Sequence, residues 1–217
     1  MSRRFETLTL EVSGHVATLI LDRESRGNSL NSRMNIELPL AWRAVEDDPN
    51  VRVAIVTGRG ERTFCAGADL HDLPTTEDPD LAKTLKSISW TAAQNGVTKP
   101  IIAAVNGLAA GGGLHFPADA DIVLAAENAK FTDPHVAVGL VSALEPIAMA
   151  RRMPLGAVMK LALTGGAEKM TAQEAHRLGF VDEVLPLADL MPRARALAEM
   201  IARYSPTAIA RTKAAIW

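Results

Sequence analysis

The amino-acid sequence predicts an α/β protein built on a parallel sheet. Residues 51–57, 101–105 and 122–125 are short apolar segments rich in Val, Ile and Ala, a pattern typical of buried strands. Each follows a segment whose apolar residues recur with helical spacing. Strands that alternate with helices in this way lie parallel to one another. Beyond about Asp133 the pattern becomes mostly helical, so we expect helices to complete the chain.

The N-terminal region predicts a hairpin followed by a helix. Residues 5–12 alternate between polar and apolar, a turn is expected at 13–14, and residues 15–21 form the returning apolar strand. Ser32 is a candidate N-cap for a helix over residues 32–47, which an Asp-Pro-Asn sequence stops.

The other helices are predicted from apolar spacing and from their end signals. Thr171 and Glu174 form a capping-box pattern, and Pro206 stands at the first position of the last helix, after Ser205. The predicted helices lie near residues 78–95, 112–118, 142–152, 155–163, 171–178 and 187–202, and from 205 onward.

The composition indicates a protein with a packed core and without a nucleic-acid partner. The chain has 217 residues, of which 48% are apolar and 22% charged, a balance typical of one large folded domain. Its 23 basic and 25 acidic residues leave a formal net charge of −2, with no run of Lys or Arg. A near-neutral chain of this kind argues against RNA or DNA as the main partner.

Cysteine content and hydropathy predict a cytoplasmic protein. Cys65 is the single cysteine, so no intrachain disulfide can form and a reducing compartment is expected. The longest apolar runs, such as residues 101–105, are far shorter than the roughly 20 residues that span a bilayer. The first residues lack the apolar core of a signal peptide. We therefore expect no membrane partner.

Two glycine-bearing loops, residues 64–70 and 106–115, each follow a predicted strand or strand end. Neither has the spacing of a phosphate-binding or dinucleotide-binding loop. Three successive glycines at 111–113, entering a helix, leave backbone N–H groups unpaired near the positive end of the helix dipole. Such a site can bind a developing oxyanion. The alternative is that the glycines only allow tight backbone packing.

Taken together, these motifs resemble the crotonase (enoyl-CoA hydratase/isomerase) superfamily. The matching segments are Phe-Cys-Ala-Gly-Ala-Asp-Leu at 64–70, Ala-Val-Asn-Gly-x-Ala-x-Gly-Gly-Gly at 104–113 and Asp-Ile-Val-Leu-Ala at 121–125, in this order and spacing. Asn-Ser-Leu at 28–30 and the segment at 171–181 match the same superfamily. The resemblance covers nearly the whole chain.

The resemblance implies a fold and an assembly. The expected fold is an α/β crotonase-like spiral of ββα repeats over residues 1–185, followed by a helical C-terminal segment over residues 186–217. In the family that segment mediates self-association, so we expect a homotrimer or a hexamer made of two trimers. Family members commonly continue for some tens of residues past the last helix, so we expect either a naturally short protein or a missing terminal segment.

The resemblance also implies acyl-CoA thioesters as substrates and no separate cofactor, because coenzyme A is part of the substrate. The thioester oxygen is held in the family by two backbone N–H groups, which map to Ala68 and Gly112. Lys83 and Lys86, on a predicted helix, either contact the coenzyme A phosphates or are ordinary solvated side chains, and both interpretations stay open. The coenzyme A portion is expected along Arg23, Arg26, Ala66, Asp69 and Leu70.

The sequence departs from the family at the two acid–base positions. Hydratases of this family use two glutamates, one three residues after the middle glycine of the triplet and one in a Pro-Glu segment about twenty residues on. Those positions hold His115 and His135 here. A neutral imidazole accepts a proton, and its pKa of about 6.5 suits general acid–base catalysis near neutrality. We expect both histidines to transfer protons; a structural role for each is the alternative.

Glu145 is a third candidate for the catalytic site. It starts a predicted helix in the region from which family members supply further acidic residues, although those lie one or two positions earlier. It can orient His135 or hold a water; the alternative is a helix-start carboxylate favoured by the dipole. Two other interpretations are weaker. His115, His135 and either Asp133 or Glu145 lack the compact spacing of a zinc site, and a lone cysteine such as Cys65 is usually inert.

The leading hypothesis is an acyl-CoA-processing enzyme that stabilises a thioester oxyanion or enolate, nominally by 2-enoyl-CoA hydration, a lyase reaction of fatty acid metabolism. Thioester hydrolysis, double-bond isomerisation and C–C bond cleavage begin with the same polarised thioester and stay open. A non-catalytic acyl-CoA-binding protein is the rival from another class. RNA binding, known in one family branch, is disfavoured by the lack of a basic run.

Overall fold

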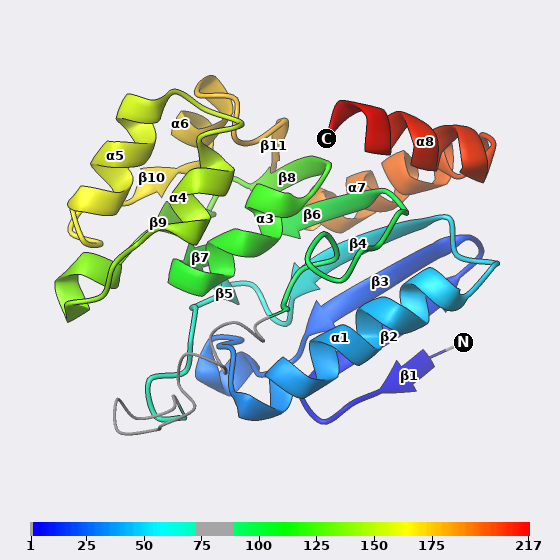
Figure 1. Cartoon of the computed structure of the whole chain (residues 1–217), viewed down its shortest axis with the longest axis horizontal. Helices are drawn as coiled ribbons and strands as arrows, with labels where there is room; N and C mark the ends of the chain where they lie inside the picture. The colour runs from blue at the N-terminus through cyan, green and yellow to red at the C-terminus, as the bar shows by residue number, and fades with distance from the viewer. Residues whose placement is uncertain (1, 73–88) are drawn as a thin grey trace.

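Figure 1 shows the computed structural model, which describes residues 2–72 and 89–217. Strands in two sheets form its frame. One sheet contains β1 (Ser2–Arg4), β2 (Leu8–Ser13), β3 (Val16–Leu21), β4 (Val53–Gly58), β6 (Ile101–Val105), β8 (Ile122–Ala126) and β11 (Glu183–Leu185), neighbours in this order. The other contains β10 (Met170–Thr171), β9 (Lys130–Thr132), β7 (Leu108–Ala110) and β5 (Thr63–Cys65), also in spatial order.

The larger sheet is antiparallel from β1 to β3 and parallel from β3 to β11. The predicted hairpin is confirmed as β2 and β3. Ser13 pairs with Val16, so the turn is Gly14-His15, one residue later than expected, and Gly14 takes a φ of 58° that favours glycine. Residues 5–7 precede the strand rather than belonging to it.

Three successive passes of the chain build both sheets at once. β4, β6 and β8 are neighbours in the larger sheet, and the strands that follow them, β5, β7 and β9, are neighbours in the smaller one. A helical segment then follows β7, made of the 3₁₀ helix η2 (Gly111–Leu114) and α3 (His115–Asp119). The predicted spiral of ββα repeats is confirmed.

Helices cover both faces of the larger sheet (Figure 1). On one face α1 (Ser32–Asp47) packs through Leu38, Trp42 and neighbouring apolar residues. On the other face α7 (Leu187–Ile201) packs its Leu190, Ala194 and Ala198 against alternate residues of β3, β4, β6 and β8. Successive residues of a strand point to opposite faces of the sheet, and here both faces are covered. β4 and β6 are therefore buried throughout, as their continuous apolar runs predict.

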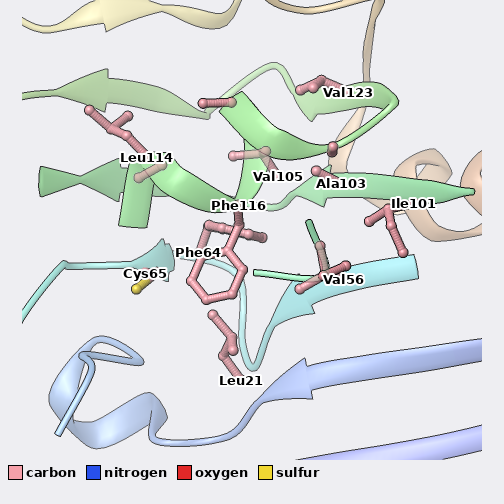
Figure 2. Packing of buried hydrophobic residues seen from close by; sticks show 14 of the residues in the cluster. Leu21, Val56, Phe64, Cys65, Ile101, Ala103, Val105, Leu114, Phe116 and Val123 are labelled. Carbon is pink, nitrogen blue, oxygen red and sulfur yellow. The ribbon is translucent and has the colours of Figure 1, made fainter. Parts of the chain in front are cut away.

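The core between the two sheets holds the aromatic residues Phe64 and Phe116, which pack edge to face with ring centroids 5.9 Å apart (Figure 2). Cys65 and Leu114 lie in the same cluster, directly beside the two glycine loops. Each fully buried side chain of this size contributes about 1.5–3 kcal/mol to folding through loss of apolar contact with water.

The side chains that cap α1 and α6 correct one predicted N-cap and confirm another. Asn31, not the expected Ser32, caps α1: its side-chain oxygen accepts a hydrogen bond from the Met34 N–H at 3.0 Å. The Ser32 hydroxyl instead donates to Asp72 at 2.7 Å. The capping box at Thr171 is confirmed. The remaining helices are η1 (Glu24–Arg26), η3 (His135–Val138), α4 (Leu144–Met149), α5 (Leu155–Leu163), α6 (Ala172–Arg177) and α8 (Pro206–Ile216).

The helix expected at 78–95 is wrong where the structure describes it. Residues 78–88 lie outside the described ranges, and residues 89–95 form loop and turn. The side-chain oxygen of Gln94 accepts hydrogen bonds from the N–H groups of Trp90 and Thr91, at 2.7 and 3.1 Å. Such local bonds compete with the helical pattern. Over residues 2–72 and 89–217, no helix is both long and apolar enough to cross a membrane.

Candidate active site

The two glycine loops meet. Gly67 has a φ of 90°, and a Cβ added there would lie 2.7 Å from the Ala110 carbonyl oxygen and 3.3 Å from the Gly112 nitrogen. On its other side the first loop pairs with Leu30, whose N–H donates to the Gly67 oxygen at 2.8 Å. No hydrogen bond among the described residues uses the Ala68 N–H. Glycine at 67 is therefore required for both conformation and contact.

The glycine triplet is enclosed on three sides. A Cβ on Gly113 would lie 2.3 Å from the Cys65 oxygen, one on Gly112 would lie 2.8 Å from the Trp90 ring, and one on Gly111 would lie 3.4 Å from His135 Cε1. Gly112 is the second residue of η2, so its N–H has no partner within that helix. Tight packing therefore explains glycine at 112 and 113, whereas Gly111 has a φ of 48°, a conformation that favours glycine. The role of Ala68 and Gly112 as oxyanion donors stays a prediction.

His115 lies directly beyond the triplet, as the first residue of α3, and is almost fully buried. Its Nε2 lies 3.2 Å from Glu145 Oε1. The ring of Trp90 meets the imidazole edge on, with centroids 5.5 Å apart. His115, at the start of α3, therefore contacts both the Trp90 ring and the Glu145 carboxylate.

His135 approaches the same carboxylate from the other side. It begins η3, its Nε2 lies 3.8 Å from Glu145 Oε1, and its Nδ1 lies 2.6 Å from Asp133 Oδ1. Ser142 donates its hydroxyl hydrogen bond to the second oxygen of Asp133. One oxygen of Glu145 therefore faces both imidazoles, and the structure brings together the three side chains that the sequence proposed for the catalytic site.

The surroundings shift the pKa values of Glu145 and His135 in opposite directions. Burial acts to raise the pKa of Glu145, but the hydrogen bond from His115 and the two nearby imidazoles outweigh it and hold that pKa below its ordinary value. The hydrogen bond to Asp133, opposed by burial and aided by Glu145, raises the pKa of His135. Glu145 therefore favours the carboxylate form, and His135 favours the protonated form. Groups whose pKa values are driven apart in this way can act as base and acid.

Asp133 was missed as a site residue by sequence reasoning, which considered it only as a metal ligand. Burial acts to raise its pKa, while hydrogen bonds from His135 and Ser142 lower it overall. The Asp-Pro-His sequence was the available signal, since it places a carboxylate two residues before a candidate catalytic histidine. Within the described ranges, no group of three His, Cys, Asp or Glu residues could hold a metal ion.

The residues expected along coenzyme A form a surface next to this site. Arg23 and Asp69 form an ion pair at 2.9 Å, and Arg23 also donates to the Ser29 carbonyl oxygen at 2.6 Å. These contacts tie the η1 region to the loop at 64–70. The pKa of Asp69 is lowered, and the hydrogen bond from Arg23 is the largest cause.

The other expected coenzyme A contacts are open to solvent. Arg26, Ala66 and Leu70 are exposed, and the Ala66 N–H donates to the Gly27 oxygen at 2.9 Å. Lys83 and Lys86 lie outside the described residues. The assignment of these residues to coenzyme A stays a prediction. Burial raises the pKa of the Cys65 thiol to about 12, so that thiol stays protonated and is no nucleophile.

Comparison with known proteins agrees with this architecture. The family model for enoyl-CoA hydratase/isomerase matches residues 11–217. The chain belongs to the enoyl-CoA hydratase/isomerase family, and so to the crotonase superfamily of acyl-CoA enzymes that the motifs predict.

Individual relatives are similar over almost the whole chain. An (E)-benzylidenesuccinyl-CoA hydratase of Thauera aromatica is 39% identical over 209 residues, 96% of this chain and 81% of its own length. A carnitinyl-CoA dehydratase of Proteus mirabilis is 36% identical, over 96% of this chain and 79% of its own. The solved structure of an enoyl-CoA hydratase/isomerase from Mycobacterium paratuberculosis superimposes with a TM-score of 0.87 at 36% identity, covering 98% of this chain and 81% of that one.

Proposed function

We propose that this protein is a cytoplasmic hydratase that catalyses the reversible addition of water to a 2-enoyl-CoA thioester, a lyase reaction. The observation that carries the proposal is the convergence of His115 and His135 on one oxygen of Glu145, directly beside the glycine triplet. The relatives named as a hydratase and a dehydratase support the same reaction class.

The proposed reaction begins at the thioester oxygen. The N–H groups of Ala68 and Gly112 bind this oxygen and stabilise the negative charge that it gains in the enolate. One such donor lowers the barrier by about 2.7–4 kcal/mol. Polarisation of the thioester makes the β-carbon of the enoyl group electrophilic, so that water can attack it.

Proton transfer then completes the addition. Glu145, with its lowered pKa, accepts a proton from the attacking water, whose oxygen bonds to the β-carbon. His135, with its raised pKa, donates a proton from Nε2 to the α-carbon of the enolate. His115 holds Glu145 by its 3.2 Å contact. The elements of water are thus added to the double bond, and a final transfer from Glu145 to His135 restores both groups.

The other reactions of the family use fewer features of this site. Hydrolysis through an acyl-enzyme needs an activated nucleophile, but the Ser142 hydroxyl donates to Asp133 and not to a histidine. Isomerisation and C–C cleavage need no base positioned for water. A non-catalytic acyl-CoA-binding protein would keep the glycine loops while having no use for a carboxylate between two imidazoles.

The test is turnover of 2-enoyl-CoA esters by His115→Ala and His135→Ala. Each should lower kcat by roughly 100-fold or more, because His135 is the proposed acid, His115 holds the proposed base Glu145, and general acid–base catalysis contributes 10²–10⁴-fold. His176→Ala is the matched control, because among the described residues that imidazole, on α6, bonds only to the Val181 carbonyl oxygen, at 2.9 Å. Wild-type kcat/KM in both site variants would refute the proposal. Binding of CoA esters by the wild type without turnover of any would favour the non-catalytic protein.

A further inference from the structure

Asp133 is a buried carboxylate with a full set of partners. Its exposure is 1%, and it accepts hydrogen bonds from His135 Nδ1 at 2.6 Å and from the His135 backbone N–H at 3.2 Å, both on Oδ1. The Ser142 hydroxyl donates to Oδ2. A carboxylate buried in this way costs free energy unless its oxygens are bonded, so the arrangement holds the Asp133 side chain in one orientation.

This geometry determines which nitrogen of His135 carries the proton. An ionised carboxylate only accepts hydrogen bonds, so Nδ1 must be the donor. In the neutral ring the lone pair then lies on Nε2, the nitrogen that faces Glu145 at 3.8 Å. The backbone N–H of His135 binds the same Asp133 oxygen, which prevents the carboxylate from turning away.

We propose that Asp133, anchored by Ser142, is a positioning residue that holds His135 in its Nδ1–H tautomer and presents Nε2 to the reacting acyl group. The inference rests on the proposed function, in which Nε2 of the protonated His135 donates to the enolate and then carries the lone pair that accepts the next proton. In the family pattern a glutamate at this position needs no such support, whereas an imidazole has two nitrogens and must be held to expose one of them.

Two anionic groups face His135 among the described residues, Asp133 and Glu145. Both favour the protonated imidazole, so removing the charge of Asp133 should lower the pKa of His135. Asp133→Asn removes the charge of this side chain but keeps an oxygen that can hold His135 in place. Its Oδ1 must still accept from the His135 backbone, so its NH₂ group faces Ser142, whose oxygen can accept a hydrogen bond. Asp133→Ala removes both the charge and the acceptor.

The experiment combines ¹⁵N NMR of the histidine rings with steady-state kinetics. In the wild type, neutral His135 should be the Nδ1–H tautomer. Asp133→Asn should keep that tautomer but titrate at lower pH, whereas Asp133→Ala should shift toward the Nε2–H tautomer that free imidazole side chains prefer. The kcat of Asp133→Ala should fall roughly 10- to 100-fold with little change in KM, as for other residues that orient a functional imidazole. His176, on α6, supplies a reference resonance.

An Nε2–H tautomer in the wild type, or a tautomer that Asp133→Ala leaves unchanged, would overturn the proposal. So would an altered tautomer with undiminished kcat, since position would then not matter to the reaction. Ser142→Ala should lower kcat less than Asp133→Ala, because it leaves the bond to His135 in place. A wild type that hydrates no enoyl-CoA would refute the proposed function, while the NMR result would still decide the tautomer.

Discussion

Gly112 combines two requirements in one residue. Its N–H is unpaired within η2, as an oxyanion donor must be, and a Cβ at this position would lie 2.8 Å from the Trp90 ring and 3.2 Å from the Leu30 side chain. The sequence pattern alone could not separate the two roles, because packing and oxyanion binding both select glycine.

Two substitutions at Gly112 separate these roles. Gly112→Pro removes the N–H and also introduces side-chain atoms, whereas Gly112→Ala introduces a Cβ and keeps the N–H. We expect Gly112→Pro to abolish turnover, and Gly112→Ala to retain more kcat while both show a similar loss of thermal stability. The measurements are kcat with a short enoyl-CoA and Tm for each variant. If a folded Gly112→Pro variant keeps its kcat, the assignment of the donor is wrong.

The opposite pKa shifts of Glu145 and His135 predict a bell-shaped profile of kcat/KM against pH for hydration. The pKa of His135 is raised above its usual value of about 6.5, so the acid persists to higher pH and the rate falls only as pH rises through that raised value. The pKa of Glu145 is lowered, so the base is lost only in acid. His135→Gln should abolish the alkaline limb. A rate that rises steadily across pH 6.5–9 would contradict this assignment.

The candidate site could be predicted in part from single residues. His115 and His135 follow from motif positions, and Glu145 from its place at a helix start. Their convergence could not be predicted, because α3, η3 and α4 are brought together by packing between segments that are separate in the chain. The contact of Asp133 with His135 depends on the turn into η3, which has no periodic signal.

At the scale of elements, prediction succeeded where the signal lies inside the element. β6 and α5 match their predicted bounds, since a continuous apolar run or a helical period specifies each one. β7, β9 and β10 have two or three residues and were not predicted. Such strands exist because distant partners pair with them, so their own residues carry too little pattern to show them.

The helix α7 should contribute strongly to stability through one side chain. Leu190 is 1% exposed and packs on the face of the larger sheet formed by β3, β4, β6 and β8. Leu190→Ala should lower the free energy of unfolding by about 2–5 kcal/mol through lost burial and the cavity that remains. Urea denaturation measures the change. Met200→Ala, on the same helix but half exposed, is the control and should change it by well under half as much.

At the scale of the whole molecule, the segment from η3 to α5 leaves large apolar side chains in solvent. Such a group of exposed apolar residues is typical of surfaces that other chains cover. The family resemblance indicates that the covering chains are further copies of this one. The exposed members are Val136, Val138, Leu140, Val141, Leu144, Ile147, Leu155, Met159 and Leu163.

We therefore predict a homotrimer, with a mass three times the 23.2 kDa of one chain, or a hexamer of two such trimers. Sedimentation equilibrium at micromolar concentration measures that mass. Ile147→Lys should shift the distribution toward monomer by burying a charge in the contact, whereas Ile36→Lys, on the exposed side of α1, should not. A wild-type monomer at these concentrations would count against the prediction.

The position of Trp90 beside His115 also makes its intrinsic fluorescence a reporter of this site. The imidazole lies edge on to the Trp90 ring with centroids 5.5 Å apart, and a Cβ on Gly112 would lie 2.8 Å from the same ring. Trp42 is buried within α1, and Trp217 lies half exposed at the end of the chain, so Trp90 alone of the three adjoins the glycine triplet. Its emission, isolated by subtraction of a Trp90→Phe variant, should therefore change when an acyl-CoA binds beside the triplet, with no added label.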